Sequence, residues 1–248
     1  MVKSTTMNEA NTNSTTQQVT SSTQPLIQLS HISKSYQDAG RKQVIFNDLN
    51  ETIHSGEFVV LMGRSGSGKS TLLNLISGID LPNSGRVVIN SNDFSQLPEE
   101  ERTIFRRHHI GFVFQAFNLI PTLTVEENLL LPLELIGKLT PADHKNAEEL
   151  LDWLGLADRT ESYPDQLSGG EQQRIAVARA IIHNPMIILA DEPTGNLDLE
   201  TGKEVIGLLD QLVRETHKTL VMVTHSREVI GIADRVLEMD DGKLTPAQ

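Results

Sequence analysis

The sequence contains no cysteine, so it can form neither disulfide bonds nor thiolate metal sites. No apolar run reaches the roughly 18–20 residues that are needed to span a bilayer, and the N-terminus has no apolar segment of the kind found in secretory signals. Basic residues are outnumbered, 21 against 33 acidic ones, and the net charge of -12 argues against nucleic-acid binding through bulk charge. We therefore expect any membrane role to be peripheral and to act through a partner.

The chain has 248 residues, and 38% of them are hydrophobic. This size suits one large α/β domain, or a core with a modest insertion. Residues 1–24 are mostly Ser, Thr, Asn and Gln, and a segment with so little to bury is predicted to be disordered. A regulatory or tethering tail is the alternative for this segment. We expect the ordered domain to occupy residues 25–248.

Short apolar runs predict the strands. A continuous run, as in residues 58–62, is typical of a parallel strand buried on both faces, and alternation of apolar and polar residues indicates a strand with one exposed face. Strands are predicted at residues 26–32, 49–54, 58–62, 86–89, 111–114, 186–190 and 219–223. Helical patterns at residues 71–76, 168–182 and 199–215 alternate with them. This alternation predicts a mostly parallel sheet with right-handed crossovers.

Residues 122–155 break the alternation. Their leucines and alanines are spaced as in helices, and Pro121, Pro132 and Pro141 punctuate the pattern. We expect this stretch to form a separate helical lobe, with the domain core in residues 25–115 and 168–248 and the lobe in residues 116–167.

Residues 63–70, Gly-Arg-Ser-Gly-Ser-Gly-Lys-Ser, match the complete phosphate-binding pattern G-x-x-x-x-G-K-[ST]. They follow a buried strand and precede a helix, as the pattern requires. The glycines let backbone N–H groups face the phosphates, and the helix N-terminus attracts an anion. Lys69 is expected to reach the β and γ phosphates, and the Ser70 hydroxyl is expected to ligate Mg²⁺. The residues predicted to bind the nucleotide here are Gly63, Arg64, Ser65, Gly66, Ser67, Gly68, Lys69, Ser70 and Thr71.

A second acidic site lies at the end of another apolar strand. Residues 186–190 deliver Asp191 and Glu192 to the carboxyl end of the sheet, where α/β proteins bind ligands. Asp191 suits a direct or outer role at Mg²⁺. Glu192 is placed to accept a proton from a water that attacks the γ phosphate.

Ser168-Gly169-Gly170-Glu171 has two interpretations. Ser followed three residues later by Glu forms a capping box, which needs no ligand. The two glycines add nothing to a cap and weaken a helix, but they let a phosphate approach the backbone closely. A second anion site beside a complete phosphate loop indicates two nucleotides, or one nucleotide shared between two chains.

Residues 167–174, Leu-Ser-Gly-Gly-Glu-Gln-Gln-Arg, resemble the signature of the ATP-binding-cassette (ABC) ATPases. The other family elements appear in their usual order across residues 26–245, on both sides of this segment. The resemblance implies that Tyr36 stacks on adenine, that Gln115 senses Mg²⁺ and the γ phosphate, and that His225 contacts the γ phosphate. Asp198 ends the segment 195–198, which resembles the loop that connects two opposed subunits in this family. The resemblance implies a P-loop NTPase with a RecA-like core, a small antiparallel β subdomain and an inserted α-helical subdomain.

The family arrangement implies a head-to-tail homodimer with two ATP molecules, each between the loop 63–70 of one chain and the turn 168–171 of the other. Catalysis would then involve Glu192, His225, Gln115 and Lys69, with Ser70, Gln115 and Asp191 at Mg²⁺. A single cassette without a membrane span implies a separate permease. Residue Ser226 departs from the family, which often has Asp after this histidine.

Residues 111–121 and 191–198 are most similar to the lipoprotein-releasing, macrolide-efflux and cell-division group of these ATPases. That group implies a permease with a large periplasmic domain and a location at the cytoplasmic face of the inner membrane. A non-transport ATPase that switches a membrane protein regulating periplasmic enzymes remains an alternative. Cassette ATPases for DNA repair or translation usually carry a second cassette or a long coiled-coil insertion, and neither is expected to fit into 248 residues.

Two further groups are less distinctive. Phe117, Leu119 and Ile120 either line the groove that receives a permease helix or pack the helical lobe. Residues 106–109, Arg-Arg-His-His, form a basic cluster that is interpreted as a solvated face, with contact to anionic lipid as the alternative.

Overall fold

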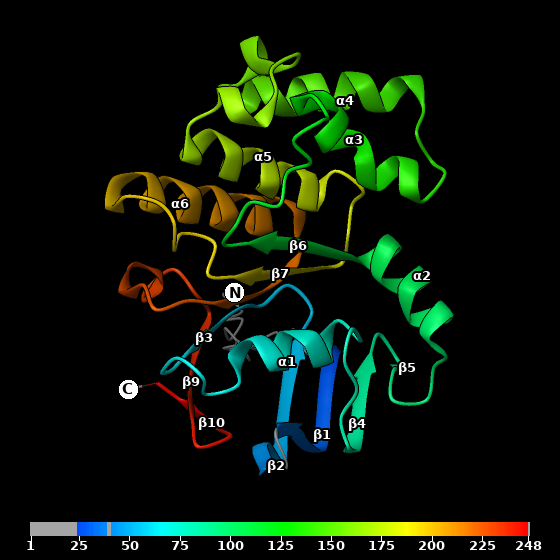
Figure 1. Cartoon of the computed structure of the whole chain (residues 1–248), viewed down its shortest axis with the longest axis vertical. Coiled ribbons are helices and arrows are strands. Elements are labelled where there is room, and N and C mark those ends of the chain that lie inside the picture. Colours follow the sequence, from blue (N-terminus) through cyan, green and yellow to red (C-terminus); the bar gives the residue numbers. More distant parts are fainter. Residues whose placement is uncertain (1–23, 39–40, 248) are drawn as a thin grey trace, which may run out of the picture.

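A computed structural model describes residues 24–38 and 41–247 (Figure 1). The polar segment predicted at residues 1–24 lies outside the described residues, apart from Gln24. Two sheets and six α-helices make up the described part of the chain. Within that part, none of the helices has the length and apolar character that crossing a bilayer would require.

A six-stranded sheet has the order β10-β9-β3-β8-β7-β6. Its strands are β3 (Phe58–Met62), β6 (Ile110–Phe114), β7 (Ile187–Asp191), β8 (Thr219–Val223), β9 (Arg235–Asp240) and β10 (Lys243–Pro246). Pairing is parallel from β9 through β6, and β10 is antiparallel to β9. The mostly parallel sheet predicted from the apolar runs is therefore confirmed.

Both faces of this sheet are buried. Because side chains alternate along each strand, successive residues of a strand face different cores. On β3, Val59 and Leu61 face one core, and Phe58 and Val60 face the other. The first core contains α1 (Lys69–Ile76) and the second contains α6 (Leu199–Thr216) together with part of α5 (Gly169–Ile181).

A second, antiparallel sheet has the order β2-β1-β4-β5 and covers the other side of α1 (Figure 1). It consists of β1 (Pro25–Asp38), β2 (Arg41–His54), β4 (Ser84–Ile89) and β5 (Asn92–Asp93). The predicted antiparallel β subdomain is present, and its first two strands are longer than the apolar alternation indicated.

The helical lobe contains α3 (Val125–Leu135) and α4 (Pro141–Trp153). They pack on Ile175 and Ala178 of α5, so α5 contributes to the core of the lobe as well as to that of the sheet. Pro132 lies inside α3 and does not end it. Our division of the chain at residues 116 and 168 stays a proposal.

Helix α2 (Glu99–His109) was not predicted, because Arg102 is its buried residue and its sequence has no apolar periodicity. Short 3₁₀ turns occupy Ala157–Arg159, Pro164–Gln166 and Arg227–Val229.

Candidate nucleotide site

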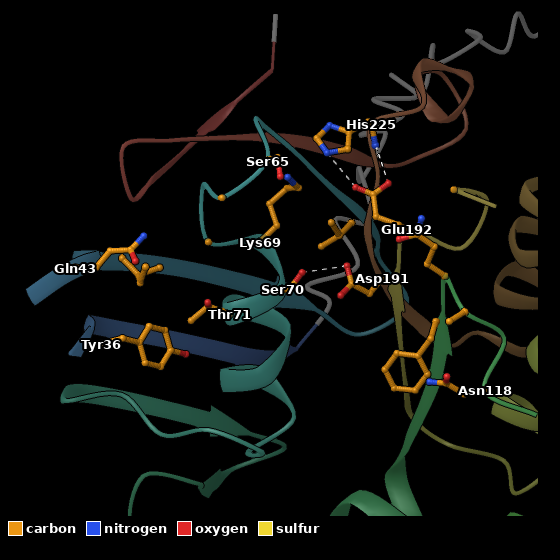
Figure 2. Close-up of a pocket in the computed structure, with 18 residues that line it drawn as sticks. Tyr36, Gln43, Ser65, Lys69, Ser70, Thr71, Asn118, Asp191, Glu192 and His225 are labelled. Carbon is orange, nitrogen blue, oxygen red and sulfur yellow. Dashed lines mark hydrogen bonds and ion pairs between the residues drawn. The ribbon is translucent and has the colours of Figure 1, made fainter. Parts of the chain in front are cut away.

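A cavity of about 920 Å³ opens at the carboxyl ends of β3, β6, β7 and β8 (Figure 2). It extends from the catalytic candidates Glu192 and His225 at one end to Tyr36 at the other. The size is in the range of small-molecule sites. The position agrees with the rule that α/β sheets bind ligands beyond the carboxyl ends of their strands.

The loop 63–68 takes a backbone path that glycine alone fits at two positions. Gly63 has φ 146°, and a Cβ there would lie 2.4 Å from the carbonyl oxygen of Met239. Gly68 has φ 105°, and its Cβ would lie 2.6 Å from Ile45 Cγ2. These left-handed conformations and close contacts explain the glycine spacing, because a side chain would force the loop away from the sheet.

Lys69 begins α1, and its side chain returns across the loop. Its Nζ donates to the carbonyl oxygens of Gly63 and Arg64, at 2.8 and 3.0 Å. Burial lowers the pKa of this ammonium group, while the carboxylates of Glu192 and Asp191 act in the opposite direction. The structure thus holds one amine at the centre of the predicted phosphate site, between the loop and two carboxylates.

Ser70 and Asp191 lie next to each other although they are 121 positions apart, since the Ser70 Oγ donates to Asp191 Oδ1 at 3.3 Å. The Gln115 side chain borders the same cavity. A hydroxyl, a carboxylate and an amide are oxygen donors of the type that Mg²⁺ accepts along with water. The residues therefore fit a magnesium ion, and its binding here stays a proposal.

Glu192 has a left-handed backbone, φ 48°, fixed by its N–H, which donates to Val223 O at 2.9 Å. Its carboxylate meets His225 twice: Oε1 lies 3.1 Å from the ring Nε2, and Oε2 accepts from the backbone N–H at 3.3 Å (Figure 2). The two predicted catalytic residues are thus in direct contact across the ends of β7 and β8.

Gln115 is held by the loop after β7. Its Nε2 donates to Asn196 Oδ1 at 3.1 Å, and Asn196 Nδ2 donates back to the Gln115 carbonyl at 2.9 Å. A Cβ on Gly195 would lie 2.7 Å from Gln115 Nε2, so glycine leaves room for this amide. Asn196 and Gly195 were not predicted as site residues.

At the other end of the cavity, the Tyr36 side chain lies beside Thr71 of α1 (Figure 2). Burial and a hydrogen bond to Asp80 raise the pKa of the Tyr36 hydroxyl. Gln43 and Ile45 of β2 also line this end. They were missed because β2 was predicted only from residue 49, and their place depends on how the antiparallel sheet packs on α1.

The Ser168 turn forms the capping box of α5. Ser168 N and Oγ donate to Glu171 Oε2 at 2.8 and 2.7 Å, and Glu171 N donates back to Ser168 Oγ at 3.3 Å. The hydrogen bonds from Ser168 lower the pKa of the Glu171 carboxyl. None of residues 168–171 is among those that line the large cavity.

Asp198 is the N-cap residue of α6. Its Oδ1 accepts from the N–H groups of Glu200 and Thr201, at 3.2 and 3.1 Å. It borders a separate hollow of about 310 Å³ with Glu192 and His225, and it does not line the large cavity of its own chain. The large cavity therefore brings together all the predicted site residues except the turn 168–171, Asp198, and Gly63, Arg64 and Ser67 of the phosphate loop.

A second, largely apolar groove of about 400 Å³ lies between α2, β6, α3 and α5. Ile79 and Leu135 border it and are 52% and 57% exposed. The sequence left two places open for Phe117, Leu119 and Ile120, a permease groove or the helical lobe. None of the three lines this apolar groove, and Leu119 packs into the helical lobe.

Part of the basic cluster at residues 106–109 packs against the rest of the fold. The side chain of Arg106 is 16% exposed and donates to Glu99 at 2.6 Å and to the Gly78 carbonyl at 2.8 Å. The expected solvated face is therefore wrong for Arg106, although Arg107 is exposed.

The ABC transporter family model matches residues 46–195. Rv0986 of Mycobacterium tuberculosis, an uncharacterized ABC transporter ATP-binding protein, is 51% identical over 90% of each chain. YtrE of Bacillus subtilis, an ABC transporter ATP-binding protein, is 46% identical over 88% of this chain and 96% of its own. The macrolide export ATP-binding/permease protein MacB of Brucella abortus is 44% identical over 89% of this chain but 34% of its own length.

Among solved structures, the ATP-binding cassette MJ0796 in a dimeric post-hydrolysis state with ADP and Pi superimposes with a TM-score of 0.82 at 42% identity. That likeness covers 90% of this chain and 98% of the other. A second dimeric structure of MJ0796 gives a TM-score of 0.80. These likenesses confirm the predicted fold class.

Proposed function

The chain belongs to the ABC transporter family as an ATP-binding subunit with ATPase activity, and we propose that two copies bind ATP head to tail and drive a separate membrane permease. The observation that carries the shared site is the position of the turn 168–171. It offers backbone N–H groups at a helix N-terminus, yet it lies outside the cavity of its own chain. A second copy brings its own turn to that cavity, as the dimeric cassettes of known structure support.

Within the shared site, the residues of the cavity have separate tasks. The loop 63–68 and Lys69 bind the phosphates, and Tyr36 supports the adenine. Glu192 accepts the proton of the attacking water, and His225, in contact with its carboxylate, keeps that group aimed at the γ phosphate. Ser70, Asp191 and Gln115 would hold Mg²⁺, which would supply positive charge at the phosphate oxygens.

The permease is proposed from the relatives and from the apolar groove. MacB and PvdT are single proteins named as ATP-binding and permease together, and this chain spans about a third of each. The groove between α2, β6, α3 and α5 leaves Ile79 and Leu135 exposed, which is typical of a docking surface. We propose that a short helix of the permease docks in this groove and that the ATPase lies at the cytoplasmic face of the inner membrane. Export or lipoprotein release, through a permease with a large periplasmic domain, is the activity that the group resemblance favours.

The test separates the two halves of the shared site. Chains carrying Glu192→Gln, which lack the base, are co-expressed with chains carrying Gly169→Asp, which block the turn. Different affinity tags isolate the heterodimer. One of its two sites combines an intact cavity with an intact turn, so we expect about half of the wild-type turnover if the sites act independently.

Both homodimers are expected to be inactive, and they are the matched controls. An inactive heterodimer with normal ATP binding would contradict shared sites, and a fully active Glu192→Gln homodimer would contradict the assignment of the base. Neither result depends on the identity of the permease.

A further inference from the structure

The ring of Tyr36 is tied to two charged residues that have no assigned role. Its Oη donates to Asp80 Oδ2 at 2.7 Å, and Lys34 Nζ lies 4.8 Å from the ring centroid. Lys34 also donates to Asp80 Oδ1 at 2.6 Å. These three side chains, which we call the tyrosine clamp, form a closed set of contacts.

The clamp is more than a surface ion pair, because Lys34 is 7% exposed. Its ammonium group is satisfied by Asp80 and by the carbonyl of Leu81 at 2.8 Å. Asp80 further accepts from the Leu81 N–H at 2.7 Å. Burial raises the pKa of Asp80, but the hydrogen bonds from Lys34 and Tyr36 outweigh it and leave the pKa below its ordinary value. A buried charge held by several fixed partners has a well-defined position.

Tyr36 needs such support, since it is 39% exposed at the rim of the cavity. A free ring at this place would lose side-chain entropy on stacking against a base. The cation covers one face of the ring, so a base stacks on the opposite face. The clamp thus prepares the ring before the nucleotide binds, which lowers the cost of binding.

The clamp also links two parts of the fold. Lys34 and Tyr36 belong to β1, whereas Asp80 follows α1 and its N–H donates to Asn74 O at 3.1 Å. The phosphate loop lies at the other end of α1. The network therefore sets the position of the aromatic ring relative to the loop that binds the phosphates.

We propose that Lys34 and Asp80 are positioning residues that fix Tyr36 as the platform for the purine base of ATP. The inference rests on the proposed role of Tyr36 in the site. It assigns to Lys34 and Asp80 an effect on base recognition and none on phosphate binding or on the chemical step.

The experiment compares Asp80→Asn with the wild type, and repeats the comparison in a Tyr36→Ala background. We expect Asp80→Asn to raise the KM for ATP about three- to tenfold, as for the loss of one hydrogen bond of typical net strength, with kcat unchanged. In the Tyr36→Ala background the same change is expected to add less than about twofold. Inhibition by inorganic tripolyphosphate, which has no base, is expected to be equal in all variants.

Asp48→Asn is the matched control, because Asp48 is an exposed carboxylate of the same antiparallel sheet that contacts His31. It is expected to leave KM unchanged. An unchanged KM in Asp80→Asn would overturn the proposal. So would an equal rise in the Tyr36→Ala background, or a matching loss of tripolyphosphate inhibition, because each would show an effect that bypasses the ring.

The equilibrium Kd for ATP separates this inference from the proposed function. If the wild-type protein bound ATP without hydrolysing it, the catalytic proposal would fail. The same four variants compared by Kd would still decide whether the clamp acts through Tyr36.

Discussion

Two adjacent glycines at the N-terminus of α5 differ in what a methyl group would meet. A Cβ on Gly169 would lie 3.5 Å from Leu197 Cδ2 and 3.6 Å from Phe117 Cζ, which is ordinary van der Waals contact. A Cβ on Gly170 would lie 2.5 Å from Thr201 Cγ2. Gly170 is therefore required for packing, whereas nothing in the folded chain itself excludes a side chain at Gly169.

This contrast gives a prediction at the residue scale. Gly169→Ala is expected to fold with an unchanged or slightly higher Tm, because alanine is favoured over glycine in helices by roughly 0.5–1 kcal/mol. Its ATP turnover is expected to fall at least about tenfold, since the methyl group blocks close approach of a phosphate to the backbone. Gly170→Ala is expected to lose about 1–3 kcal/mol of stability through overpacking.

Thermal unfolding and steady-state ATP hydrolysis on the same preparations separate these effects. Gly207→Ala is the control, because Gly207 lies within α6 and a Cβ there would meet nothing within 4 Å. That variant is expected to keep full turnover. Wild-type activity in Gly169→Ala would show that the bare backbone of the turn is not used.

At the scale of the element, α2 depends on charge at its N-terminus. Glu99 accepts hydrogen bonds from Arg106, Arg102 and Thr103, which lower the pKa of its carboxyl from 4.5 to about 2. Two of these donors, Arg102 and Arg106, also donate to the Gly78 carbonyl, so the network fastens α2 to the loop after α1.

The sign of the pH dependence follows from the lowered pKa. The contribution of Glu99 to stability is fully present above its unfolded pKa near 4.5, and it is lost as the pH falls through about 2. Glu99→Gln is expected to lower Tm slightly at neutral pH, because exposed ion pairs contribute little, and the difference from the wild type is expected to shrink steadily below pH 4.5. Calorimetric melting at several pH values measures this, with Glu101→Gln in the same turn as the control. A difference that stays constant down to pH 3 would rule out the ionised carboxylate as its source.

The same helix marks the limit of prediction from sequence. Continuous apolar runs identified β3, β7 and β8, since both faces of those strands are buried. Helix α2 has no such pattern, because the largely buried side chains of Arg102 and Arg106 share its inner face with Phe105. Pro132 misled in the other direction, because it lies within α3 without ending it.

For the site, too, the sequence predicted only the residues that belong to local motifs. Residues within local motifs, such as Lys69, Asp191 and Glu192, were predicted to lie together, and the structure brings them to one cavity. Gln43, Ile45 and Asp80 were missed, because their place depends on the packing of the antiparallel sheet and α1, to which no local pattern refers.

At the scale of the whole molecule, the apolar groove and the nucleotide cavity share β6. Phe112 and Phe114 of that strand stack with ring centroids 5.5 Å apart. Phe114 lines both hollows, and Gln115 follows it at the edge of the cavity. The end of one strand thus joins the proposed permease surface to the proposed sensor of the γ phosphate. Movement of the helical lobe against the sheet would alter both places together.

Leu135 borders the groove but not the nucleotide cavity, so we expect that the groove can be damaged there without harming basal hydrolysis. Leu135→Lys places a charge on an apolar side chain that borders the groove and is 57% exposed, so the fold is expected to tolerate it. Co-purification with the membrane permease is expected to fall at least about tenfold, because the charge would be desolvated on docking. ATP hydrolysis by the isolated subunit is expected to stay within about twofold of the wild type. Trp153→Lys, at a 42% exposed apolar residue of α4 outside the groove, is the control and is expected to keep the permease bound. Equal loss of the permease in both variants would mean that the partner recognises the helical lobe in general and not this groove.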